Sequence, residues 1–481
     1  MSYAFSELIT KPEGKTLEFK RDLSSPKNFL KTLVAFANTA GGILLFGIAD
    51  TSKTVLGITN PLDDEERLCN LIADSIEPRL VPSVELLAWE DKTLLAVEVY
   101  PSGNRPHWLK TEGPQSGVYV RLGSTNRQAD SDLIQELRRS AMGIAFDEQS
   151  MPDSTVNDLD FSAAVSCFAQ QRKLMKKDLE SLRLVTKHQG HRVPTVGGLL
   201  LFGKNKAMIF PDAWVQCGRF IGTDKADIFD HIDIHDHLPV VVERIMEFLK
   251  KHAMRGADFS ALRRKDVWSI PLTLLREAVV NAVVHADYSQ KGAPIRVAFF
   301  DDRIEIENPG ILLPGLTIED MLQGVSKLRN RVIARVFREL DLIEQWGSGV
   351  RRIFKEAEML GLPKPEIIEL GMRVRFIVYL AAPQRIITTS EEGVESGVES
   401  GVESEMALRV LGYLKGTALS KKELALKLGK TKPTRYLNDL MNRLLNDDAV
   451  QFTVPDKPNS RLQKYRITKA GRALLKTMGK K

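Results

Sequence analysis

The sequence predicts a multidomain α+β protein, and three observations support this fold class. The chain has 481 residues, more than one hydrophobic core usually organises. Strand-like apolar runs alternate with longer stretches of helical period. The repeat GVESGVESGVES between Gly393 and Ser404 contains too few apolar residues to form a core, which predicts a flexible linker. We expect an N-terminal α/β domain (1–145), a connecting α/β region (146–245), a second α/β domain (246–382), a linker (383–404) and a small C-terminal domain (405–481).

Composition and charge narrow the class of protein. The chain is 43% hydrophobic and 27% charged, as in soluble globular proteins, and has no long apolar run or signal-peptide layout. Its three scattered cysteines suit a reducing compartment and argue against a zinc site. These features predict a cytoplasmic protein that does not bind membranes. Residues 405–481 contain 18 Lys and Arg against 6 Asp and Glu, which predicts a polyanionic partner for this segment.

The basic C-terminal segment reads as three helices, two strands around a basic loop and a final helix. This order resembles a winged helix-turn-helix, with helix 432–447 expected in the major groove of DNA. The alternative is a module that contacts only protein. The residues expected to touch DNA are Arg435, Asn438, Asn442 and Arg443 on the helix, and Lys457, Arg461, Lys464 and Arg466 on the wing.

The first 245 residues mix helical and strand patterns. NFLKTLVAFANTAGGILLFGIADTSKTVLGI predicts a helix, a Gly-Gly turn and two strands, LLAWEDKTLLAVEVYPS predicts a hairpin, and SGVYVRLGSTNRQAD predicts a final strand entering a loop. Between 146 and 245, VGGLLLFGK and AWVQCGRFIG are strand-like. The histidine-rich DHIDIHDH indicates a polar strand edge or loop rather than a metal site.

One helix pattern, LREAVVNAVVHADYS, places Glu277, Asn281 and His285 four residues apart. This spacing puts the three polar side chains on one face of a helix whose other positions are apolar. A solvated helix edge would explain the stripe equally well.

Two later segments favour a site. PIRVAFFDDRIEIENPGILLPG predicts a strand, a turn and a second strand that leads into Asn308-Pro309-Gly310. In LIEQWGSGVRRIFKEAEMLG, Gly347 and Gly349 open a helix. With the stripe, these segments resemble, in the expected order, the N-box and two glycine boxes of the GHKL ATPases. The resemblance implies an α/β sandwich of the Bergerat type that binds ATP with Mg²⁺ as cofactors and has weak ATPase activity.

The GHKL resemblance assigns roles to the stripe. Asn281 would ligate Mg²⁺ through its amide oxygen, and Glu277 would orient or deprotonate the attacking water. His285 would border the phosphates, although a packing role accounts for it equally well.

The resemblance also assigns roles to the glycine boxes. Gly347 and Gly349 would let backbone N–H groups approach the phosphates. The first box, which contains Gly310, departs from the family because Asn308 stands where an aspartate usually accepts a hydrogen bond from adenine. The Asn308 carbonyl still offers an acceptor.

Near the N-terminus, EGKTLEFKRDL, FANTAGGILLFGIAD and YVRLGSTNRQAD resemble the Schlafen-type AlbA domain. Schlafen-type ribonucleases hold a divalent metal with two glutamates and a later aspartate, which here match Glu13, Glu18 and Asp50. Lys20 would steady the developing charge. The alternative is that these acids pair with neighbouring cations on a surface that only binds nucleic acid.

Proteins with this combination of domains are commonly described as transcriptional regulators of bacteria and archaea. The resemblance therefore predicts an ATP-binding, nucleic-acid-binding regulator that responds to nucleotide, with a metal-dependent ribonuclease as the alternative. A homo-oligomer is expected by analogy with GHKL domains. The sequence contains no P-loop motif, so it does not predict a P-loop helicase motor.

Overall fold

The structure, a computed structural model, describes residues 5–49, 52–253, 255–258, 265–343, 349–381, 409–428, 448–453 and 463–478, with positions 437, 440, 441, 444 and 445. The chain forms two compact units, Met1–Ile386 and Ile387–Lys481. None of the described helices has the length and apolar character needed to cross a bilayer.

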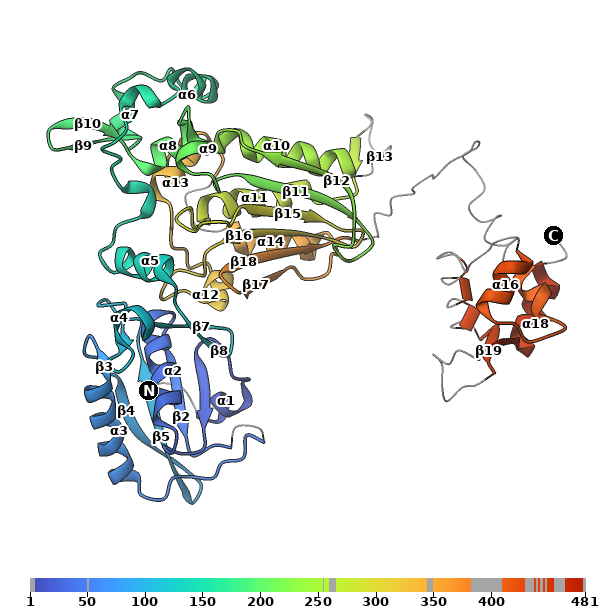
Figure 1. Ribbon diagram of the computed structural model, residues 1–481, viewed down its shortest axis with the longest axis horizontal. Helices are drawn as coiled ribbons and strands as arrows, with labels where there is room; N and C mark the ends of the chain where they lie inside the picture. Colours follow the sequence, from blue (N-terminus) through green and yellow to red (C-terminus); the bar gives the residue numbers. More distant parts are fainter. Residues whose placement is uncertain are drawn as a thin grey trace. The chain divides into compact units, whose positions relative to one another are not determined.

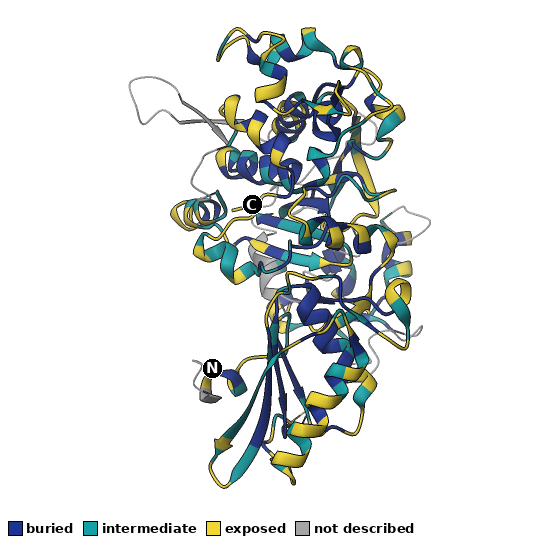
Figure 2. Cartoon of the chain, turned by 90° about the vertical axis from the view of Figure 1, so that its left-hand side faces the viewer, coloured by how far each residue is buried: buried dark blue, intermediate teal, exposed yellow. Residues whose placement is uncertain are grey.

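The N-terminal part of the first unit is built on a four-stranded mixed sheet with the order β1-β2-β5-β4 (Figure 1). Side chains of β2 alternate between two cores: Leu44 and Phe46 pack with α2 and α3, whereas Ile43 and Leu45 pack on the other face. The central strands are consequently buried (Figure 2). The elements are α1 (Phe5–Thr10), β1 (Leu17–Lys20), α2 (Pro26–Asn38), β2 (Gly42–Phe46), α3 (Pro61–Ser75), β3 (Ile76–Glu77), β4 (Ser83–Trp89), β5 (Lys92–Val99), β6 (Trp108–Leu109), α4 (Gly113–Ser116), β7 (Tyr119–Leu122), β8 (Thr125–Gln128) and α5 (Ser131–Ala141).

Most of the elements expected here are present. The hairpin expected in LLAWEDKTLLAVEVYPS is confirmed as the antiparallel pair of β4 and β5. The prediction of a strand in TVLGI is wrong, because this segment makes only an isolated bridge between Ile48 and Val55. The loop expected after β7 is a tight turn into a second strand, β8, which pairs with β7.

Residues 146–209 form a mainly helical region. VGGLLLFGK, expected as a strand, is the buried helix α8, and Thr195 caps it by accepting a hydrogen bond from Gly198 N at 2.9 Å. A short run of apolar residues does not distinguish a buried helix from a buried strand, which explains the error. The elements are η1 (Phe146–Glu148), η2 (Val156–Asp158), α6 (Phe161–Phe168), α7 (Asp178–Ser181), β9 (Val185–His188), β10 (His191–Pro194), α8 (Val196–Phe202) and α9 (Lys206–Ile209).

A six-stranded sheet with the order β12-β11-β15-β16-β18-β17 forms the rest of this unit. Helices α10, α11 and α14 pack together against it (Figure 1). β11 and β12 precede residue 245, so the boundary expected there lies within one layered structure with a single core. The elements are β11 (Val215–Ile221), β12 (Asp227–Ile234), α10 (Leu238–His252), β13 (Arg255–Asp258), β14 (Lys265–Trp268), α11 (Leu272–His285), β15 (Ile295–Phe299), β16 (Arg303–Pro309), α12 (Ile318–Gln323), α13 (Arg331–Glu339), α14 (Gly349–Met359), β17 (Glu366–Leu370) and β18 (Arg373–Tyr379).

The second unit has its own apolar core, to which Val410, Leu424 and Ile467 contribute. Its described elements include α16 (Lys421–Lys427), the antiparallel pair β19 (Val450–Phe452) and β20 (Tyr465–Ile467), and α18 (Lys469–Met478). Ser420 caps α16, since its side chain accepts a hydrogen bond from Glu423 N. The paired strands followed by a helix agree with the expected order of elements.

Candidate functional site

The polar stripe of α11 lines a cavity of about 160 Å³. Glu277, Asn281 and His285 all contribute to the lining, while Val279 and Val283 on the same helix are buried in the core. Glu277 itself is buried. The stripe therefore faces a cavity and is not a solvated helix edge.

The end of β16 supplies a second wall of the cavity, with Asn308 and Gly310 in its lining. The side-chain amide of Asn308 donates to the carbonyl of Pro309 at 3.2 Å. Gly310 has a φ of +103°, and a Cβ there would lie 2.9 Å from the Cβ of Asp287. A side chain at position 310 would therefore be both strained and crowded.

The start of α14 supplies the third wall. A Cβ on Gly349 would lie 2.1 Å from Oε1 of Glu277, so either the Glu277 side chain or the start of α14 would have to move to accommodate it. Gly347 lies outside the described residues. Three segments that are far apart in the sequence thus line one cavity. They contain Asn281, Asn308 and Gly349.

Sequence reasoning missed the partner of Glu277. Oε2 of Glu277 lies 2.5 Å from Nη2 of Arg352, which is on α14 one turn after Gly349. Oε1 accepts a hydrogen bond from the Asn281 amide at 3.4 Å. The position of Arg352 beside the glycine box was the available signal, because residues three apart share a helix face.

Most of the remaining lining is apolar, which is typical of small-molecule sites with a few orienting polar groups. The side chains that form it come from α11, β16, the loop after β16 and β18, and include Ala282, Ile306, Leu312, Leu316, Val374 and Phe376. Lys327 and Arg329 also line the cavity and add positive charge. Sequence reasoning did not identify either cation.

His285 should make stability depend on pH. Burial, with a smaller contribution from the positive charge of Arg329, lowers the pKa of His285 from 6.5 to about 4. Between these values the unfolded chain binds more protons than the folded chain, so stability is lost as the pH falls. We expect His285 to lower the free energy of unfolding by up to about 3 kcal/mol between pH 6.5 and pH 4.

Chemical denaturation of the wild type and His285→Gln between pH 4 and pH 8 measures this effect. The neutral variant should lose less stability on acidification than the wild type. Equal losses for the two proteins would contradict the assignment.

The acids expected to form a nuclease site have other partners. Glu18 is buried, and its two carboxylate oxygens lie 2.6 Å from Nζ of Lys20 and 2.5 Å from Nη1 of Arg121. Glu13 accepts a hydrogen bond from Phe19 N at 2.8 Å, and Asp50 lies outside the described residues. Among the described residues, no group of three or more His, Cys, Asp or Glu side chains is placed to hold a metal ion.

The histidine-rich segment lies at a sheet edge, as the sequence indicated. His231 belongs to β12, the edge strand of the six-stranded sheet. His235 stacks on Trp214 with ring centroids 5.3 Å apart, and His237 precedes α10. Packing accounts for two of the three rings, since the ring of His237 also lies 6.0 Å from that of Phe202.

Two of the residues expected to touch DNA are described. Arg466 is exposed on β20, and Lys464 lies 3.1 Å from the Glu423 carboxylate while its side chain stays 45% exposed. The others, Arg435, Asn438, Asn442, Arg443, Lys457 and Arg461, lie outside the described residues.

Family models match three parts of the chain. Residues 13–130 match the Schlafen AlbA_2 family, and residues 292–378 match HATPase_c_4, described as "Putative ATP-dependent DNA helicase recG C-terminal". Residues 406–468 match the family Fic-like_C, described as "Filamentation induced by cAMP protein Fic-like, C-terminal domain". The chain combines AlbA_2, HATPase_c_4 and Fic-like C-terminal domains. The HATPase_c_4 match contains Asn308, Gly310 and Gly349 but begins after α11.

Two solved structures are similar to this chain. A crystal structure of a Corynebacterium diphtheriae protein is 18% identical over 98% of this chain and 97% of its own, with a TM-score of 0.43. The N-terminal domain of a RecG-related protein from Nitrosomonas europaea, solved in solution, is 31% identical over 26% of this chain and 89% of its own, with a TM-score of 0.21.

Proposed function

We propose that the HATPase_c_4 domain binds ATP with Mg²⁺ in the cavity of α11, and that this binding regulates a nucleic-acid-binding protein. The observation that carries the proposal is that the stripe and both glycine boxes line one mainly apolar cavity. The sheet covered by α10, α11 and α14 also agrees with a Bergerat-type sandwich. The description of the matching family as ATP-dependent supports the same ligand.

Each polar group of the cavity suits one part of a nucleotide. The Asn281 amide oxygen would hold Mg²⁺, and the backbone at Gly349 would approach the phosphates. The Asn308 carbonyl would accept a hydrogen bond from the adenine amino group, because its amide nitrogen already donates to Pro309. Glu277 would orient water only after its ion pair with Arg352 opens.

Calorimetry and thermal melting with ATP and Mg²⁺ test the proposal on the full chain. At a hundredfold excess of nucleotide over Kd, the stability of the wild type should rise by about 2.7 kcal/mol. Asn281→Ala should lose Mg²⁺-dependent binding, whereas Glu277→Ala should retain binding and hydrolyse ATP about 10² more slowly. Gly349→Ala should weaken binding, since its methyl group would crowd both Glu277 and Asn281 and push the first backbone N–H groups of α14 away from the stripe.

Gly103→Ala is the matched glycine control, because a Cβ there meets nothing within 4 Å. If the wild type shows neither binding nor an ATP-dependent shift in melting at millimolar nucleotide, the proposal fails.

The nucleic-acid partner is the second part of the proposal. The net charge of +12 between 405 and 481 and exposed Arg466 support duplex DNA binding by a winged helix, and the AlbA_2 match supports a further nucleic-acid surface. Affinity of the full chain for duplex DNA should fall steeply with salt, because Lys and Arg side chains that contact phosphates release counterions from the DNA. Lys464→Ala and Arg466→Ala should each weaken all sequences about equally in a gel-shift assay. Salt-independent binding would contradict this charge-based mechanism.

The alternative function, metal-dependent RNA cleavage at Glu13, Glu18 and Asp50, has less support. The Glu18 carboxylate is buried and already paired with Lys20 and Arg121, which supports a structural role for it. Incubation of the wild type with structured RNA and Mg²⁺ or Mn²⁺ separates cleavage from binding alone.

A further inference from the structure

The segment between β16 and α13, residues 310–330, is a wall of the cavity, and we call it the wall segment. Ile311 lines the cavity and also belongs to an apolar core with Val120 of β7 and Leu133 and Leu137 of α5. One side chain of the wall segment is therefore shared between the HATPase_c_4 cavity and the N-terminal part of the chain.

Polar contacts fix other points of the wall segment to the N-terminal part. Gly315 N donates to the carbonyl of Thr39, just after α2, at 2.9 Å. Leu312 N donates to Glu369 at 2.8 Å, and the other carboxylate oxygen of Glu369 forms an ion pair with Lys15. The cavity wall is thus held from outside the domain that contains the cavity.

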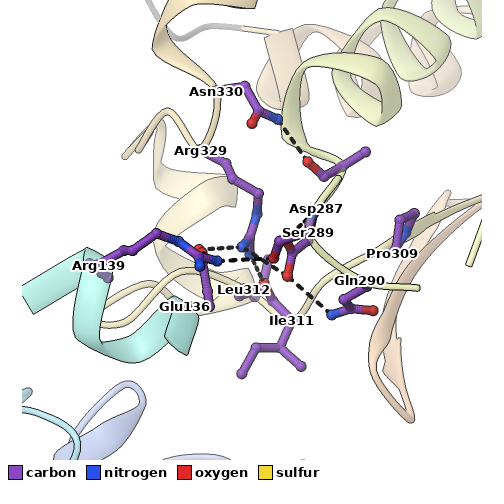
Figure 3. A network of polar contacts seen from close by, with 12 residues as sticks. Glu136, Arg139, Asp287, Ser289, Gln290, Pro309, Ile311, Leu312, Arg329 and Asn330 are labelled. Carbon is purple, nitrogen blue, oxygen red and sulfur yellow. Dashed lines mark hydrogen bonds and ion pairs between the residues drawn. The ribbon is translucent and has the colours of Figure 1, made fainter. Parts of the chain in front are cut away.

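A buried ion pair lies at the end of the wall segment (Figure 3). Nη1 of Arg329 donates to Oε1 of Glu136 on α5 at 2.7 Å, and Nη2 donates to the carbonyl of Ile311. Oε2 of Glu136 accepts from Arg139, which also donates to Ser289 at 2.9 Å. Arg329 therefore joins α5 to both ends of the wall segment.

The next residue joins the wall segment to the stripe helix. Nδ2 of Asn330 donates to the carbonyls of Val284 and Ala286 at 2.9 and 2.7 Å, at the C-terminal end of α11. Because α11 carries Glu277 and Asn281, a displacement of Arg329 and Asn330 would shift the stripe as well as the wall segment.

We propose that Glu136 and Arg329 are positioning residues that couple occupancy of the cavity to docking of α5. Release of α5 breaks the ion pair between Glu136 and Arg329. It also separates Leu133 and Leu137 from Ile311. Both changes loosen the wall segment and, through Asn330, the end of α11. A ligand that needs the intact cavity suppresses this release by mass action. By linkage, any partner that binds the released form of α5 lowers the affinity of the cavity for its ligand by the same factor. The inference rests on the proposed nucleotide site.

Amide hydrogen exchange on the full chain with and without ATP and Mg²⁺ tests the coupling. Where exchange of α5 and β7 amides requires release of α5, a hundredfold excess of nucleotide over Kd should slow it up to about 100-fold. Glu136→Gln should fold, bind ATP more weakly at matched conditions and lose most of this slowing at equal saturation. The matched control Glu148→Gln removes a more exposed pair with Arg331 and should retain the slowing.

The outcomes separate the two proposals. If calorimetry shows ATP binding but slowed exchange is confined to residues 272–378, the coupling is overturned and the nucleotide site stands. If calorimetry shows no binding, the nucleotide site itself fails and the coupling falls with it. Should Glu136→Gln not fold, Ser289→Ala removes the hydroxyl that accepts from Arg139 and donates to Asp287, and it should reduce the slowing.

Discussion

Replacing Glu18 with alanine is expected to destabilise the N-terminal domain by about 3 to 5 kcal/mol, the usual cost of removing one partner of a buried ion pair. The Arg121 guanidinium would keep only neutral acceptors, the Gly14 carbonyl at 3.0 Å and Asn126 Oδ1 at 2.9 Å. Arg121 is only 1% exposed, and its Nη1 lies 2.5 Å from the carboxylate that the substitution removes. Thr32 would lose its hydrogen bond to the same oxygen. The variant should therefore unfold more readily because of Arg121, whether or not the domain has catalytic activity.

Hydrogen exchange of the paired amides of β1 and β2 measures the loss in this domain within the full chain. Asp22→Ala is the control, since Asp22 is exposed and its carboxylate accepts only from the nearby Ser24, and it should cost less than about 1 kcal/mol. Glu18→Gln keeps an acceptor for Arg121 and should lie between the two. A Glu18→Ala variant as stable as the control would show that the neutral acceptors of Arg121, Gly14 O and Asn126 Oδ1, are sufficient without the carboxylate.

The stripe and the two glycine boxes could be predicted because each depends on short-range sequence patterns. A spacing of four determines which side chains share a face of α11, and Asn308 and Gly310 follow directly from a recognisable strand. The family resemblance then indicated that these segments meet. Their common lining of one cavity agrees with that expectation.

The contacts that position the site could not be predicted in the same way. Arg329 and Glu136 are 193 residues apart, and nothing near either residue in the sequence indicates the other. Similarly, β11 was expected as a strand, but its parallel pairing with β15 was not, since parallel neighbours are joined through long connections. Local patterns therefore predicted the groups that face the ligand, while the supports of the cavity depend on tertiary packing.

Asp147 provides the second large expected effect. Its carboxylate is fully buried and accepts hydrogen bonds from the backbone N–H groups of Arg331, Val332 and Ile333 at 3.0, 2.7 and 2.9 Å. These are the first residues of α13, whose own N-cap residue, Asn330, makes no side-chain capping bond. Asp147→Ala should lower the free energy of unfolding of the first unit by about 3 to 6 kcal/mol, roughly 1 to 2 for each unpaired N–H group.

The measurement should be made by chemical denaturation at about pH 8. Burial, opposed by the three backbone donors, raises the pKa of Asp147 from 3.8 to about 7, so the carboxyl group is mostly ionised only above that value. The folded chain holds the Asp147 proton more tightly than the unfolded chain does. The contribution of Asp147 to the free energy of unfolding of the wild type therefore falls as the pH rises from about 4 to about 7.

Two variants make the interpretation of Asp147 specific. Asp147→Asn keeps one acceptor oxygen and should lose about half as much stability as Asp147→Ala, if the lost hydrogen bonds cause the effect. Asp158→Ala removes a carboxylate that caps η2 at the exposed Thr155 N, and should cost only about 0.5 to 1 kcal/mol because water replaces the acceptor there. Since α13 directly follows Arg329 and Asn330, loss of its cap should also weaken ATP binding. An Asp147→Ala variant no less stable than Asp158→Ala would mean that α13 does not depend on this cap.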